Sequence, residues 1–153
     1  MKVDSMKHVF FIFSIVVAAL NAQEYKAVFN CNSNDMQYIA SRMVLVERTM
    51  DMIEKNGGTS KFVITIHGGC APIVSKNYDE IILDEKDLAS VDLSQKQLVK
   101  LANRGVEIVV CAMSLNANTI DESNVIPSVK ISPNSFMETI SYQNNGYALM
   151  VFE

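Results

Sequence analysis

The stretch RGVEIVVCAMSLNANTI, residues 104–120, indicates how this chain folds. Gly105 and the β-branched run after it predict a short interior strand, which we expect to end with Cys111 as its last inward residue. A short helix and a loop are expected directly afterwards. A thiol at the end of a buried strand either fills the core or takes part in chemistry, and the surrounding sequence must decide between these roles.

Towards the N-terminus, strands and helices alternate. Residues 25–30 and 62–67 predict strands, and residues 36–56 predict the helix between them. The apolar residues of that helix follow one another at steps of about 4, 3, 4 and 3, so they share one face and belong in the core. They are Ile39, Met43, Val46, Met50 and Ile53. Residues 76–92 are acidic and lack a clear period, so we expect a solvated connection there, followed by a helix that ends at Arg104.

Towards the C-terminus, residues 129–132 and 147–152 predict two further strands. Ser135 and Glu138 match the S-x-x-E capping box, which predicts a helix from Ser135 to Tyr142 between those strands. Strands that alternate with helices along a chain are typical of a mostly parallel sheet covered on both faces. The pattern therefore predicts an α/β fold.

The first 22 residues have the pattern of a secretory signal. Lys2 and Lys7 form a basic start, an apolar run follows over residues 9–20, and small residues lie near Ala22. The apolar run is too short for a comfortable membrane span, which needs roughly 20 residues. We expect cleavage after Ala22, with cleavage after Ala19 or an uncleaved anchor as alternatives. The mature chain, residues 23–153, has the size of one domain.

Composition excludes several classes of function. The chain has 13 Lys and Arg against 17 Asp and Glu, a formal net charge of −4, and it shows no basic stripe. Nucleic acid is therefore not an expected partner. His67 is the only histidine outside the signal, which excludes sites that need two histidines. No Walker loop, GxSxG or GxGxxG motif occurs.

All three cysteines follow predicted strands. Cys31 follows the first strand, His67 and Cys70 follow the second, and Cys111 ends the third. Ligands of open α/β sheets bind outside the carboxyl ends of the strands, so we expect these residues to share a crevice. Export favours disulfide formation, an odd count leaves at least one thiol unpaired, and a Cys31–Cys70 pair would leave Cys111 free. Alternatively, the thiols are buried core residues, or they bind Cu(I) or Zn(II) together with His67.

Cys111 is expected to be the most reactive of the three thiols. It stands where a strand gives way to a helix, so the backbone amides of residues 112–114 can point at its sulfur and favour the thiolate. Ser114 can add a hydroxyl donor. Cys70 also stands just before a predicted short helix, so the HGGC turn at residues 67–70 is the alternative site, whereas Cys31 precedes a polar loop without a comparable turn.

Several of these stretches together resemble the DsrE/DsrF-like sulfur-relay family. They are FVITIHGG at residues 62–69, the RGV turn with its strand and Cys111, VIPSVKISP at residues 125–133, and QNNGYA at residues 143–148. The resemblance covers about residues 25–152. It implies a flavodoxin-like three-layer α/β sandwich with five strands, and assembly as a homotrimer or homohexamer.

The resemblance also implies a function. Cys111 matches the cysteine that accepts sulfane sulfur as a persulfide in the sulfur-transferring members, which work with donor and acceptor proteins. We therefore expect an exported, periplasmic sulfur carrier or sulfurtransferase, without a cofactor and without membrane attachment after signal cleavage. The alternatives are an oligomer that binds a small ligand without chemistry and a thiolate and histidine metal-binding module.

Overall fold

A five-stranded sheet, parallel throughout, forms the centre of the molecule. The computed structural model describes residues 22–152, and the strand order across the sheet is β4-β3-β2-β1-β5. The strands are β1 (Glu24–Cys31), β2 (Thr59–Ile66), β3 (Glu107–Cys111), β4 (Lys130–Ser132) and β5 (Ala148–Phe152). The helices are α1 (Met36–Lys55), α2 (Glu85–Asn103), α3 (Ala112–Ala117) and α4 (Ser135–Asn144), and the 3₁₀ turns are η1 (Gly68–Val74), η2 (Tyr78–Glu80) and η3 (Glu122–Asn124). The predicted α/β class and parallel five-stranded sheet are confirmed.

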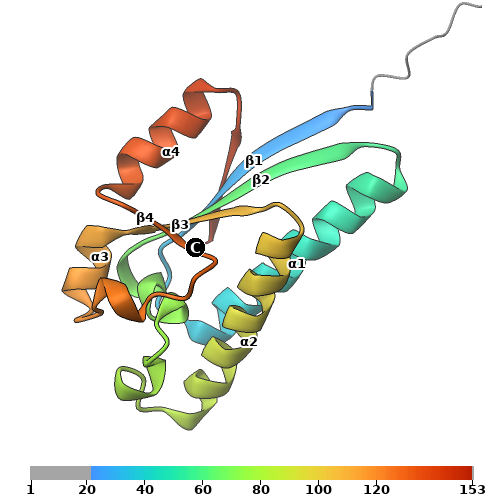
Figure 1. The fold of residues 1–153 in the computed structure, drawn as a ribbon. Coiled ribbons are helices and arrows are strands. Elements are labelled where there is room, and N and C mark those ends of the chain that lie inside the picture. Colours follow the sequence, from blue (N-terminus) through green and yellow to red (C-terminus); the bar gives the residue numbers. More distant parts are fainter. Residues whose placement is uncertain (1–21, 153) are drawn as a thin grey trace, which may run out of the picture.

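The helices lie in two layers, one on each side of the sheet (Figure 1). α1 and α2 pack side by side against one face, and α4 packs against β1, β2, β3 and β5 on the other face. The position of α4 follows from the topology, because β4 and β5 are the two edge strands and the chain between them must cross the sheet. α3 lies near the end of β3 and contacts η1.

The main core lies between the sheet and the layer formed by α1 and α2. The five residues of the predicted apolar stripe on α1 are all buried, so that expectation is confirmed. α1 begins after Asp35, whose side chain accepts a hydrogen bond from the backbone N–H of Tyr38, and this cap satisfies a donor that the helix leaves unpaired. It ends before Gly57, whose φ of +76° suits a residue without a Cβ.

The expected solvated connection over residues 76–92 is wrong in its second half. α2 begins at Glu85, after Asp84, whose carboxylate accepts the N–H of Lys86. The buried residues of α2 include Val91, Ser94, Leu98 and Leu101, which follow at helical steps. Ser94 interrupts the apolar period of α2, which explains why the sequence of its first turns predicts a loop.

The expected capping box at Ser135 is also wrong, although the helix is present. Asn134 caps α4, because its side chain accepts the N–H of Phe136 at 2.8 Å. Glu138 accepts the hydroxyl of Ser132 at 2.9 Å instead of returning to the helix start. Ser135 is therefore the first helical residue, and its polar groups are available to the neighbouring strand end.

The expected signal, residues 1–22, lies outside the described residues except for Ala22. Among the helices of residues 22–152, none combines the length and the apolar character needed to cross a membrane.

Candidate functional site

A pocket of about 180 Å³ opens at the carboxyl ends of β3 and β4, where α3 and α4 begin. Its lining comes from these strand ends and helix starts and from the residue after β2. The lining residues are His67, Cys111, Met113, Ser114, Asn134, Ser135 and Phe136. The structure thus brings together three of the residues singled out in the sequence, Cys111, His67 and Ser114. Cys31 and Cys70 do not line this pocket.

The thiol of Cys111 is free and almost buried, with 5% of the residue exposed. Burial by itself raises the pKa of this thiol. Hydrogen bonds from the backbone N–H groups of Ser135 and Ser114, and then from their hydroxyls, outweigh burial and hold the pKa below its ordinary value. Two helix starts therefore stabilise the thiolate at one point.

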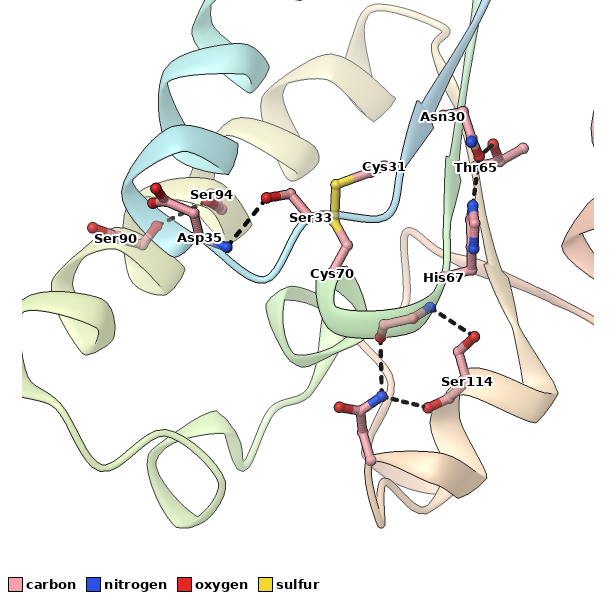
Figure 2. The surroundings of a disulfide bond; sticks show 12 residues. Asn30, Cys31, Ser33, Asp35, Thr65, His67, Cys70, Ser90, Ser94 and Ser114 are labelled. Carbon is pink, nitrogen blue, oxygen red and sulfur yellow. Dashed lines mark hydrogen bonds between the residues drawn. A yellow bond between two sulfur atoms is a disulfide. The ribbon is translucent and has the colours of Figure 1, made fainter. Parts of the chain in front are cut away.

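His67 belongs to a small polar network beside the pocket (Figure 2). Its Nε2–H donates to Oδ1 of Asn30 at 2.7 Å, and the hydroxyl of Thr65 donates to the same oxygen at 3.1 Å. Burial lowers the pKa of His67, so the ring is neutral near neutral pH. With the proton on Nε2, the lone pair of Nδ1 remains free to accept a hydrogen bond or a proton.

Ser114 is held in place by the turn that follows β2. Its hydroxyl oxygen accepts the backbone N–H of Gly68 at 2.9 Å, and it can still donate its own proton towards Cys111. The side-chain amide of Asn118 donates to the carbonyl oxygens of Gly68 and Ser114, at 3.0 and 2.8 Å. Gly68 has a φ of +54° and lies so close to Asn32 that a Cβ would collide with that side chain. The positive φ therefore favours glycine here, and a residue with a Cβ would also displace the side-chain amide of Asn32.

Cys31 and Cys70 form a disulfide, with Cα atoms 5.9 Å apart (Figure 2). Both residues are fully buried in the core cluster under α1 and α2. The bond joins the end of β1 to η1 and so fixes the turn that begins with His67 and Gly68. The pairing that the sequence left open is thus present, and it leaves Cys111 as the free thiol of residues 22–152.

The expectation of one crevice shared by all three cysteines is wrong. All three do follow strands at the same edge of the sheet, but they lie on different faces. Cys31 pairs in register with Ile66, and Ile66 with Val110, so these three side chains share the core face. Cys111 is one residue further and points to the opposite face, where its register partner is Ser132. The expectation that Cys111 is the last inward residue of its strand is therefore wrong for the main core. Val110 is the last residue of β3 in that core, and Cys111 ends the strand on the pocket side.

The alternative of a metal module built from all three thiols and His67 is not supported. Two of its four ligands are consumed by the disulfide. Within residues 22–152, no cluster of three or more His, Cys, Asp or Glu side chains is placed to hold a metal ion.

Sequence reasoning missed the contribution of α4 to the site. Asn134, Ser135 and Phe136 line the pocket, and Ser135 donates to Cys111. The missed signal is topological, since the residues after β4 emerge at the same sheet edge as those after β3. Asn30 was missed as well, although its position one residue before Cys31 places it on the same face as His67.

Comparisons with known proteins agree with the fold and identify the family. The model of the DsrE/DsrF-like family matches residues 25–152. An uncharacterized protein of Aquifex aeolicus (strain VF5) is 32% identical over 144 residues, which are 94% of this chain and 63% of that relative. The chain thus spans less than two thirds of the relative's length.

A solved structure is similar as well. The protein of unknown function MTH1491 from Methanobacterium thermoautotrophicum superposes with a TM-score of 0.65 at 15% identity. The match covers 83% of this chain and 98% of that protein, and at this identity it supports the fold alone. Because the family model spans nearly all of the described residues, the chain belongs to the DsrE/DsrF-like family, a family associated with sulfur relay.

Proposed function

We propose that this protein carries sulfane sulfur as a persulfide on Cys111. The supporting observation is the free thiol of Cys111 in a pocket, with its pKa lowered by donors from Ser114 and Ser135. The thiolate is the nucleophilic form of cysteine, and the site favours it at the only thiol outside the disulfide in residues 22–152. Membership of a family associated with sulfur relay supports the same chemistry.

The proposed transfer has two displacement steps. In loading, the Cys111 thiolate attacks the outer sulfur of a donor persulfide R–S–SH, the donor S–S bond breaks, and its electron pair leaves with R–S⁻. The product is Cys111–S–SH. In unloading, an acceptor thiolate attacks that outer sulfur and releases the Cys111 thiolate. Neither step needs an added oxidant or reductant, because one S–S bond replaces another.

We assign to His67 the task of taking the proton of the incoming acceptor thiol. Its neutral ring lines the same pocket, and the hydrogen bond from Nε2 to Asn30 leaves Nδ1 as the basic atom. A neutral imidazole can generate the acceptor thiolate, whereas an imidazolium could not. The ring of Phe136 packs edge-on against His67, with centroids 5.8 Å apart, and limits its rotation.

The direct test is the mass of the protein after incubation with glutathione persulfide. The native chain should gain one sulfur atom, and Cys111→Ser should gain none. As a matched control, Ser141→Cys in the Cys111→Ser chain adds an exposed thiol on α4 away from the pocket donors. Equal loading of this displaced thiol would contradict the proposal, since reactivity would then not depend on the site.

Assembly as a homotrimer or homohexamer is part of the proposal. The family resemblance supports it, and so does an apolar surface on α4, where Phe136, Met137 and Ile140 are more than half exposed. Light scattering should give a trimer or hexamer, and Ile140→Glu should lower the mass. Met52→Glu, at an equally exposed methionine on α1, should leave the mass unchanged. A native monomer would refute the assembly.

Export to the periplasm is also proposed, on the signal pattern of residues 1–22. N-terminal sequencing of the exported form should find a start at or near Gln23. Recovery of the intact chain in a membrane fraction would contradict cleavage.

A further inference from the structure

We propose a second binding site, between α1 and β5, that takes a small apolar carboxylate through Arg42. A pocket of about 200 Å³ lies there. It is lined by Phe29, Arg42, Leu45, Val46, Thr49, Met150, Val151 and Phe152. None of these residues lines the pocket of Cys111, so the proposal goes beyond sulfur transfer.

One wall of this pocket is a single stripe of α1. Arg42, Leu45, Val46 and Thr49 follow at steps of 3, 1 and 3, so they lie on the same face of the helix. The stripe covers two helical turns, a length of roughly 10 Å. Arg42 lies at one end of the stripe and Thr49 at the other, and the two lining residues between them, Leu45 and Val46, are apolar.

The opposite wall is apolar and comes from the edge of the sheet. Phe152 and Phe29 pack against each other with ring centroids 6.1 Å apart, and both are nearly buried. Met150 and Val151 of the edge strand β5 are exposed by almost half. The pocket therefore has an apolar floor that remains accessible from the rim.

The charge of Arg42 is unmatched within residues 22–152. No carboxylate among them forms an ion pair with it, and its Nε is buried without a hydrogen-bond acceptor. The guanidinium lies over the ring of Tyr38, 4.6 Å from the centroid, and this cation–π contact supplies no hydrogen-bond acceptor for Nε. A buried donor without a partner is costly, so an acceptor supplied by a ligand would stabilise this arrangement.

The acidic residues of α1 cannot supply that acceptor, because they are engaged elsewhere. Glu47 pairs with Lys100 at 2.8 Å, and Arg104 pairs with Asp51 at 2.7 Å and Glu54 at 2.9 Å. These pairs connect α1 to α2. The acidic residues of α1 therefore lie towards α2, whereas Arg42 lies towards β5.

These features together select a monocarboxylate with an apolar tail. A guanidinium binds a carboxylate through two parallel hydrogen bonds. Among the lining residues within 22–152, Arg42 alone is charged, so a dianionic phosphate would keep an unpaired charge, and a neutral amphiphile would leave the guanidinium unpaired. A chain about as long as two helical turns matches a medium-length fatty acid or an arylalkanoate.

Isothermal titration of the purified protein with octanoate tests the proposal. We expect one saturable site, with octan-1-ol binding at least tenfold more weakly. Arg42→Gln should weaken the binding of octanoate at least tenfold and remove the preference for octanoate over octan-1-ol. Arg42→Lys should retain part of this preference. Arg48→Gln is the matched control, because Arg48 is exposed on the same helix and does not line the pocket.

A second variant tests the pocket itself. Leu45→Trp fills the space between α1 and β5 from the rim and should also abolish octanoate binding. Unchanged octanoate affinity in Arg42→Gln overturns the proposal. So does octanoate that binds only after Glu153→Gln, because the side-chain carboxylate of Glu153 would then be the partner of Arg42. If the native protein does not bind octanoate and Arg42→Gln has a lower mass than the native protein by light scattering, the face between α1 and β5 contacts a second copy of the chain, and the proposal is overturned.

Discussion

Replacing Ser114 by alanine should raise the pKa of the Cys111 thiol and slow its reaction with alkylating reagents. The hydroxyl of Ser114 is fixed by the N–H of Gly68 at 2.9 Å and helps to lower the pKa of Cys111. The substitution removes this hydroxyl donor and keeps the backbone N–H groups of Ser114 and Ser135. The change is therefore a partial one.

The size of the effect follows from the strength of such a bond. A hydrogen bond to a charged group contributes about 1.5–3 kcal/mol, and one pKa unit corresponds to about 1.4 kcal/mol. Sulfur is a weak acceptor, so the lower limit applies, and we expect an increase of about one unit. Below both pKa values the thiolate fraction then falls about tenfold. Because nucleophilicity rises with pKa, the net slowing is about three- to fourfold.

The assay is the rate of alkylation by iodoacetamide as a function of pH, without reductant so that the disulfide stays closed. The midpoint of the rate profile reports the pKa of Cys111. Ser94→Ala is the matched control, because Ser94 is a buried serine on α2 whose hydroxyl donates to the carbonyl of Ser90. Its profile should match that of the native chain. An unchanged midpoint in Ser114→Ala would refute the assignment of the hydroxyl as a donor to the thiolate.

Four further outcomes are expected. Titration of the unfolded mature chain with a thiol reagent should count one thiol before reduction and three after it, and any other first count would contradict the disulfide. Replacing Cys31 and Cys70 together by alanine should lower the free energy of unfolding in urea by about 4 kcal/mol, because the bond closes a 39-residue separation. Met43→Ala should cost about 3 kcal/mol, since Met43 is fully buried, whereas Met52→Ala, at an exposed site of the same helix, should cost less than about 0.5 kcal/mol; equal costs would contradict the described core. Burial lowers the pKa of His67 below 6.5, so the unfolded chain binds its proton first and stability should fall as the pH drops through 6.5; His67→Gln should flatten that part of the urea stability curve.

The periodic parts of the fold were predictable because burial acts on them directly. The apolar steps along α1 match a face that packs on the sheet, and the continuous apolar runs of residues 62–67 and 106–110 match strands covered on both sides. The start of α2 was not predictable in the same way. There Ser94 occupies a buried position and satisfies its hydroxyl within the helix, so a core position carries a polar residue.

The site was predictable only as an edge of the sheet, because strand ends fix where residues emerge but not on which face. Side chains alternate along a strand, so a shift of one residue separates Val110, in the core, from Cys111, in the pocket. Cys31 points to the same face of the sheet as Val110. It can therefore form a disulfide with Cys70 but not with Cys111, which points to the other face. The register that decides this belongs to pairs of strands far apart in the sequence.

This alternation also explains how one edge can hold a closed disulfide and a free thiol at the same time. The disulfide on the core face anchors the turn that begins at His67, and the same turn presents Gly68 to Ser114 on the opposite face. Oxidation of Cys31 and Cys70 therefore stabilises the support of the proposed sulfur site without consuming its thiol. A design with all three sulfurs on one face would bring Cys111 within reach of exchange with the disulfide and would compete with the transfer of sulfur.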